Sequence, residues 1–361
     1  MLKITPLLVA AGLLGAVPLE AAAAESWKFT VRDVKPPREL GTAPVVLPVA
    51  SSFAALSRGA TGKHRLCLLL PSTKDRVFQA YIYGAVDEAK RLGQALTVHD
   101  AGGFEFEARQ HEQFDRCLAE GAQAILLQPV NPDGWESDLA RARQQGVKVI
   151  NATEGVNASV DGRALASFQL IGHLLGAELS KYHPAGGTPV KVVVLPGSTD
   201  QPFAQDTVTG LREGLKDSSA VVAQVVYGTL EDASQRQLVE EVLAAHPDVQ
   251  YIIGNAIAIK QAVPLLAKRG LSERVKLIST YLDFDLLGYI HDGKVLASAA
   301  ESSVMIKRIA VNLAVAAIEG KGTAHDLIAE AQLVTQANSG DHRLVKANFA
   351  PMLWKPVYQL D

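Results

Sequence analysis

The sequence predicts an α/β protein built from two similar doubly wound parallel-sheet domains joined by a hinge. From Arg65 onward, continuous apolar strands alternate with amphipathic helical segments, which is typical of a parallel sheet covered on both faces. The first strand and loop, "RLCLLLPSTKDRVF" (65–78), return as "VKVVVLPGSTDQPF" (190–203). Three pairs of equivalent positions in the two copies are separated by nearly the same number of residues. The separation is 125 residues from Pro71 to Pro196, 127 from Ala124 to Tyr251 and 128 from Val147 to Val275. The chain therefore carries one architecture twice.

The elements of the first copy follow from local patterns. Apolar runs predict strands at 66–71, 95–100, 122–129 and 147–152, and helical periodicity predicts helices at 77–93, 107–121 and 133–146. Gly93, Gly121 and Gly146 stand where these three helices should end. The second copy repeats this plan from Val190 onward.

The N-terminus reads as a secretory signal peptide over residues 1–24. Lys3 is followed by an apolar stretch, and small residues precede a cleavage point before Glu25. A membrane anchor is the alternative, but Pro6, Pro18 and Glu20 interrupt the run well short of the ~20 residues that span a bilayer. We therefore expect export to the periplasm. The formal net charge of −3 and the absence of a long basic run argue against a nucleic-acid partner.

The two cysteines, Cys67 and Cys117, would sit in an oxidising compartment after export. Cys67 lies early in a predicted strand, and Cys117 lies late in a helix just before the next strand. Both fall at the same end of an α/β sheet, so a disulfide is geometrically reasonable. Two inert buried thiols are the alternative.

The repeat also predicts the domain boundaries. After the signal peptide, an irregular Pro- and Gly-rich N-terminal arm should cover 25–63. We expect one lobe from 64–152 with 283–304, a second from 153–282 with 305–335, and a C-terminal tail, 336–361, that crosses the lobes. Ligands of open α/β sheets bind beyond the carboxyl ends of the strands, so the two lobes should face a shared cleft and close over a ligand about the hinge.

Catalytic motifs are missing from the sequence. No dinucleotide fingerprint, P-loop or nucleophile elbow is present, and the nine histidines form no zinc-type cluster. We therefore expect a binding protein with no catalytic residues, no cofactor and no metal.

Candidate ligand-binding residues are those that follow the predicted strands: Asp75, Phe78, Phe104, Gln128, Asn151, Asn255 and Tyr281. Several of these residues also have a structural alternative to ligand binding. Asp75 would cap its helix, Phe104 or Phe106 would pack beneath a loop, and the asparagines would form turns. Together they predict a partly aromatic cleft, which suits a sugar or a methylated ammonium group.

The chain resembles the type I periplasmic binding proteins, and within them the TorT-like sensors of trimethylamine N-oxide systems. The stretches "LCLLLPSTKD", "HDAGGFE", "FDRCLAEGAQAILL", "GNAIAI" and "WKPVYQL" carry this resemblance over nearly the whole mature chain. It implies a ligand sensor that reports trimethylamine N-oxide, or a related small polar compound, to the periplasmic domain of a membrane sensor histidine kinase. A sugar-binding subunit of an ABC importer is the alternative.

The resemblance also implies roles for single positions. Asp75 and Tyr281 match an aspartate and a tyrosine of the family, and Phe104 stands where the family has a tyrosine. Phe78 replaces a tryptophan. Val77 and Ser167 stand where the family has further cage aromatics, so Phe106 or Trp135 should compensate, or the pocket accepts another ligand.

Overall fold

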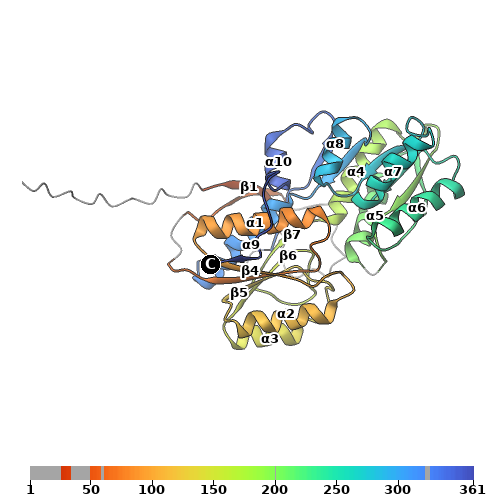
Figure 1. Cartoon of the computed structure of the whole chain (residues 1–361). Helices are drawn as coiled ribbons and strands as arrows, with labels where there is room; N and C mark the ends of the chain where they lie inside the picture. The colour runs from red at the N-terminus through yellow and green to blue at the C-terminus, as the bar shows by residue number, and fades with distance from the viewer. Residues whose placement is uncertain (1–25, 34–48, 58–60, 200, 322–325) are drawn as a thin grey trace, which may run out of the picture.

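The computed structural model describes residues 26–33, 49–57, 61–199, 201–321 and 326–361. They form two α/β lobes, the first in orange and yellow and the second in green and cyan (Figure 1). The predicted signal peptide, 1–24, lies outside the described residues. Among the helices of the described ranges, none is long and apolar enough to cross a bilayer.

The sheet of the first lobe draws strands from the start, the middle and the end of the chain. Its strand order is β15-β4-β3-β5-β6-β7-β13-β1-β2. The central strands β4, β3, β5, β6, β7 and β13 pair in parallel, and β15, β1 and β2 add antiparallel edges. The bounds are β1 (Lys28–Asp33), β2 (Ala50–Ala54), β3 (Arg65–Leu70), β4 (Ala95–Asp100), β5 (Ala124–Leu127), β6 (Lys148–Thr153), β7 (Gly162–Leu165), β13 (Asp326–Ala329) and β15 (Gln359–Leu360).

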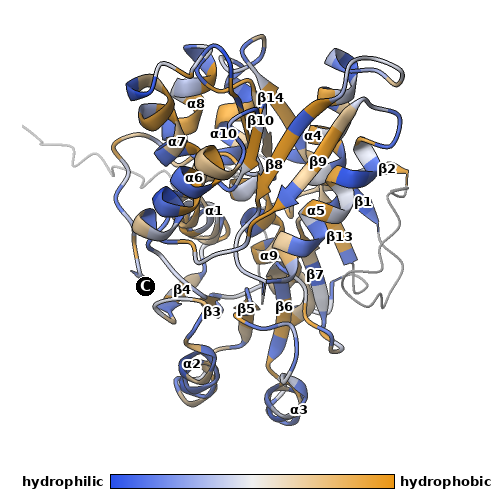
Figure 2. Cartoon of the chain, turned by 90° about the vertical axis from the view of Figure 1, so that its right-hand side faces the viewer, coloured by the Kyte–Doolittle hydropathy of each residue, from blue (hydrophilic) through white to orange (hydrophobic). Residues whose placement is uncertain are grey.

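The sheet of the second lobe has the order β14-β12-β11-β10-β8-β9. All its pairs are parallel except the antiparallel pair of β12 with the edge strand β14. Figure 2 shows hydrophobic colouring along much of β8 and β10, as expected for strands buried on both faces. The bounds are β8 (Val190–Leu195), β9 (Ala220–Val225), β10 (Tyr251–Gly254), β11 (Lys276–Ser279), β12 (Ala297–Ala300) and β14 (Gln332–Thr335).

Helices cover both faces of each sheet, because successive strand residues point to opposite faces. In β3, Leu66, Leu68 and Leu70 pack under α1 and α9, whereas Cys67 and Leu69 pack toward α2 and α3. In the second lobe, α4 and α5 cover one face, and α6, α7 and α8 the other. The bounds are α1 (Arg76–Leu92), α2 (Glu107–Ala119), α3 (Glu136–Gln144), α4 (Phe168–Tyr182), α5 (Pro202–Gly214), α6 (Asp232–Ala245), α7 (Ala256–Lys268), α8 (Phe284–His291), α9 (Ser303–Ile318) and α10 (His342–Asn348).

The lobe boundaries differ from the predicted ones. The chain leaves the first lobe only after β7, not after 152, because β7 adds a further parallel strand to β6. It returns after β12, since α8 and β12 belong to the second lobe and α9 packs on the first. The assignments of 283–302 to the first lobe, and of 305–318 and 326–329 to the second, are therefore wrong. Amphipathic patterns identify these helices but not the sheet that each one covers.

The sequence had indicated an irregular N-terminal arm, but part of the arm is ordered. Within it, β1 and β2 pair antiparallel and extend the first sheet beyond β13. The Trp27 indole donates a 2.9 Å hydrogen bond to the buried Glu88 carboxylate on α1. The tail starts in the second lobe with α10, and its β15 pairs with β4 of the first.

Cys67 of β3 and Cys117 of α2 form a disulfide with a Cα–Cα distance of 6.1 Å. Both cysteines are buried in the core between the first sheet and helices α2 and α3. The bond therefore ties a helix to the sheet that it covers.

Candidate ligand-binding site

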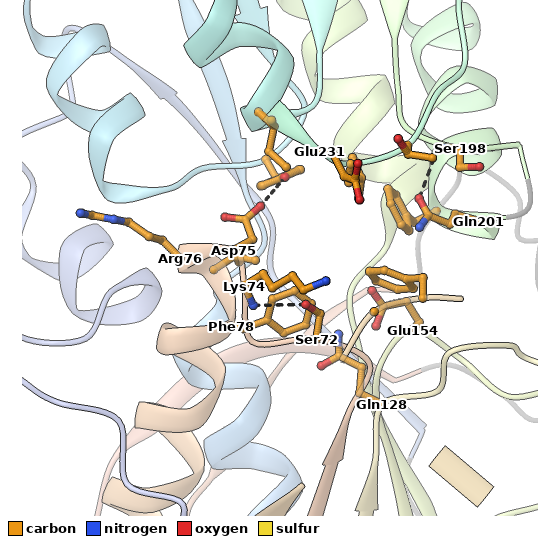
Figure 3. Close-up of a pocket in the computed structure, with 18 of the residues that line it drawn as sticks. Ser72, Lys74, Asp75, Arg76, Phe78, Gln128, Glu154, Ser198, Gln201 and Glu231 are labelled. Carbon is orange, nitrogen blue, oxygen red and sulfur yellow. Dashed lines mark hydrogen bonds between the residues drawn. The ribbon is translucent and has the colours of Figure 1, made fainter. Parts of the chain in front are cut away.

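A cavity of about 630 Å³ lies between the two lobes. Its wall comes from the loops and helix starts that follow β3 to β7 in the first sheet and β8 to β12 in the second. These are the carboxyl ends of the parallel strands, where open α/β sheets bind ligands. Figure 3 shows side chains from both lobes, among them Asp75, Gln128, Gln201 and Glu231, around one open space.

Aromatic rings run across this wall from one lobe to the other. Tyr81 and Phe78 of α1 lie with ring centroids 5.6 Å apart, and Phe104 follows 6.5 Å from Phe78. Phe104 contacts Phe203 of the second lobe at 6.3 Å, and Phe168 lies 5.5 Å beyond Phe203. Such faces hold a cation or stack on a sugar.

At the N-terminus of α1, two polar contacts join the lobes beside the cavity. The Tyr281 hydroxyl, from the loop after β11, donates a 2.7 Å hydrogen bond to Asp75 Oδ2. Arg76 lies 3.3 Å from the Asp285 carboxylate, but both side chains are about half exposed, so this pair contributes little. Asp75 stands at the N-cap position of α1 without a side-chain capping hydrogen bond. The capping interpretation of Asp75 is therefore wrong, and its carboxylate faces the second lobe.

The deep end of the cavity holds a buried charged cluster. Glu301 accepts hydrogen bonds from the Tyr81 hydroxyl and, at 3.2 Å, from Ser303 Oγ. The Lys307 ammonium donates a 2.6 Å hydrogen bond to Gln128 Oε1 and lies 4.7 Å from the centre of the Tyr81 ring.

Burial governs the protonation of this cluster. Desolvation raises the pKa of Glu154 to about 7, against the opposing attraction of Lys307. Desolvation also lowers the pKa of Lys307 to about 7, while Glu154 and Glu301 oppose the change. Burial likewise raises the pKa of Glu301, with the Asp75 charge adding to the increase. The pKa of Tyr81 and of Tyr281 lies well above its usual range for the same reason, so both hydroxyls keep their protons.

The backbone beside both glutamates is strained. Thr153 has a backbone φ of 72° and Ser302 has a φ of 65°. These are left-handed values that residues other than glycine rarely adopt. Thr153 precedes Glu154, and Ser302 follows Glu301. Ser302 is held by hydrogen bonds from its amide to Asn348 Oδ1 and from its hydroxyl to the Glu330 carbonyl. Strain of this kind gathers at functional sites, where surrounding contacts hold it in place.

Five of the seven predicted site residues line the cavity: Asp75, Phe78, Phe104, Gln128 and Tyr281. Asn151 and Asn255 do not. The Asn151 amide donates to the carbonyls of Leu127 and Glu154, and Asn255 caps α7 by accepting from the Ala258 amide. These two asparagines support the loops, as the alternative interpretation held.

The two aromatics expected to compensate for lost cage walls also lie elsewhere. Phe106 is 40% exposed, and the Arg109 guanidinium lies over its ring. Trp135 is fully buried, where it packs against Phe114 and His111. Phe168 and Phe203 provide the additional aromatic faces instead. Phe203 was visible in the repeat as the counterpart of Phe78, whereas Ser167 caps the helix that Phe168 begins.

Several cavity residues were not among those predicted from the sequence. Tyr81 lies one helical turn after Phe78, so helical spacing alone points it to the same side. Glu154 and Glu301 follow strands that meet only in the folded protein.

The family model "Periplasmic binding protein domain" matches residues 66–322. The chain belongs to the periplasmic binding protein family. This periplasmic binding protein is 27% identical over 294 residues to the periplasmic protein TorT of Escherichia coli (strain K12), covering 81% of this chain and 84% of TorT. A binding-protein family agrees with the cavity between the lobes.

Solved structures resemble this periplasmic binding protein closely. An ABC transporter solute-binding protein from Bradyrhizobium sp. BTAi1, with bound bis-tris, is 28% identical with a TM-score of 0.81, over 91% of this chain and 98% of that one. The complex of the TorS sensor domain with TorT in the presence of TMAO matches at 23% identity and a TM-score of 0.76, over 82% of this chain and all of that one. At 23% identity, the similarity to TorT in this complex shows a shared fold.

Proposed function

We propose that this periplasmic binding protein captures a small polar compound with a positively charged or polarised centre, trimethylamine N-oxide or a related molecule. The observation that carries this proposal is the cavity itself. Six aromatic side chains and the carboxyl groups of Asp75, Glu154 and Glu301 surround it. Aromatic faces and carboxylates both attract positive charge.

We further propose that ligand binding is reported to the periplasmic domain of a membrane sensor histidine kinase. The similarity to TorT supports this role, and TorT is the protein that forms a complex with the TorS sensor domain. The protein reaches the periplasm through the signal peptide at 1–24, and N-terminal sequencing of the mature protein tests cleavage before Glu25.

Two measurements test the proposal in order. A thermal-shift screen of the mature protein with trimethylamine N-oxide, betaines, bis-tris and sugars identifies ligands, since a ligand of the native state raises the melting temperature with its concentration. Co-purification with the kinase's periplasmic domain, with and without the best ligand, then tests the reporting role. Failure to associate in both conditions contradicts it. We expect no turnover of any bound compound.

The second candidate is a solute-binding subunit of an ABC importer. It is favoured by the similarity to the Bradyrhizobium solute-binding protein, which spans more of this chain than TorT does. Uptake of the labelled ligand by cells with and without the gene separates the two functions. An importer subunit is needed for uptake, whereas a sensor is needed only for the transcriptional response.

A further inference from the structure

We propose that the ligand is a protonated amine that also carries hydroxyl groups, that is, an amino alcohol or an amino-polyol. This inference rests on the proposed function, because it assigns the chemical class of the compound held in the same cavity. Polar atoms without partners, an excess of carboxyl groups and the aromatic wall each support it.

Three polar atoms of cavity residues have no partner at hydrogen-bond distance within the described part of the chain, although the Gln128 amide lies near enough to the Glu154 carboxyl to lower its pKa: Asp75 Oδ1, Glu154 Oε2 and Gln128 Nε2. All three are shielded from solvent, and Gln128 is fully buried. Burying a polar atom without a hydrogen-bond partner destabilises the folded protein, so a ligand that supplies the partner is favoured. The three residues that carry these atoms all line the cavity. Two of the atoms accept hydrogen bonds and one donates.

The charges at the deep end select a cation. Asp75, Glu154 and Glu301 lie close enough that Glu301 interacts with both of the others, and Lys307 is the ammonium group that opposes them. The Lys307 ammonium already donates a hydrogen bond to Gln128. Farther out, Lys260 pairs with Asp283, and Lys74 is exposed at the cavity. A positively charged ligand therefore relieves the repulsion among the carboxylates.

Other ligand classes satisfy only part of this wall. An anion is repelled by the carboxylates. A neutral sugar donates to Asp75 and Glu154 but leaves their charge uncompensated. A quaternary ammonium group or an amine oxide fits the aromatic rings but has no N–H to donate to the two carboxylate oxygens. A protonated amine donates to both carboxylates, and a ligand hydroxyl accepts from Gln128 Nε2.

Matched pairs of compounds test the inference by calorimetric titration of the mature protein in phosphate buffer, which contains no amine. N-methylglucamine is compared with sorbitol, and 2-amino-1,3-propanediol with glycerol, so that each amine has a neutral polyol beside it. Trimethylamine N-oxide is the third class. We expect at least one amine to bind at least about tenfold more tightly than its neutral partner and than trimethylamine N-oxide, because a charged hydrogen bond is worth roughly 1.5–3 kcal/mol.

The substitution Glu154→Gln keeps the shape of the side chain and removes its charge. We expect it to lower amine affinity at least about tenfold while it leaves sorbitol binding within about twofold. Glu240→Gln, on the exposed face of α6, is the matched control and should change neither. If Glu154→Gln melts much below the parent protein, Asp75→Asn serves in the same comparison.

The inference is overturned if neither amine binds, or if the neutral polyols or trimethylamine N-oxide bind as tightly as the amines. In the latter case the cavity still binds a small molecule, so the proposed function stands. Loss of kinase association, by contrast, contradicts the reporting role and leaves the ligand class untouched.

Discussion

The Tyr281 hydroxyl of the second lobe donates a 2.7 Å hydrogen bond to the Asp75 carboxylate of the first. The two residues lie 206 positions apart in the sequence and meet beside the cavity. This contact links the state of the hinge to the residues that line the site.

Tyr281→Phe should shift the unliganded protein toward an open arrangement. The substitution removes the hydrogen bond to a charged group, worth roughly 1.5–3 kcal/mol, and keeps the ring in place. We expect a larger radius of gyration in small-angle scattering and ligand affinity that falls about tenfold. Tyr289→Phe, on α8 outside the cavity wall, is the control. An unchanged scattering curve together with parental affinity contradicts a role for this contact in closure.

Amine binding should weaken as the pH falls from 8 to 6. In the unliganded protein the pKa of Glu154 is raised to about 7, so below that pH the carboxyl is protonated and the bound cation must displace its proton. Protonation of Lys307, whose pKa is lowered to about 7, adds repulsion in the same direction. The neighbouring Tyr81 keeps its proton over this range, and Gln128 does not titrate. Burial also raises the pKa of Glu301, so protonation of this carboxyl acts in the same direction.

The pH dependence is measured by titrating N-methylglucamine, an alkylamine that stays protonated throughout. Affinity should drop by up to about tenfold per pH unit below 7 through the Glu154 carboxyl alone. Glu154→Gln should flatten the profile, and sorbitol binding should not follow it. A parental profile in the Glu154→Gln variant contradicts the assignment to this carboxyl.

The two-lobed fold was predictable because strand and helix periodicities repeat along the chain. The cavity position followed as well, since carboxyl strand ends meet between the lobes, and Asp75 and Tyr281 were found in this way. The sequence did not show that Asn151 and Asn255 turn inward to support loops, because a side chain's direction at a strand end depends on the local turn. The Glu154–Glu301–Lys307 cluster joins the loop after β6 to the segment that runs from β12 into α9, so only tertiary packing reveals it.

Helices α4 and α5 should tolerate no side chain at Gly172, where their backbones approach closely. A Cβ atom at Gly172 of α4 would overlap the backbone carbonyl of Thr207 in α5. A backbone group in a helix cannot move aside as a flexible side chain can. Gly172→Ala should therefore lower the free energy of unfolding by about 3 kcal/mol. Gly288→Ala in α8 meets no atom within 4 Å, and should be neutral or raise stability by up to about 1 kcal/mol. Urea unfolding midpoints compare the two; equal midpoints contradict the tight packing.

Removing the disulfide should reduce stability without changing the site. Cys67 and Cys117 are separated by 50 residues, and closing a loop of that length stabilises the native state by about 4 kcal/mol in the chain-entropy model. The bond lies in the core under α2 and α3, whereas the cavity is built at the carboxyl ends of the strands. The double substitution to alanine should thus lower the urea midpoint and keep ligand affinity within about twofold. A reducing agent should reproduce the loss in the parent protein and have no effect on the variant; equal stability of oxidised and reduced parent protein contradicts the role of the bond.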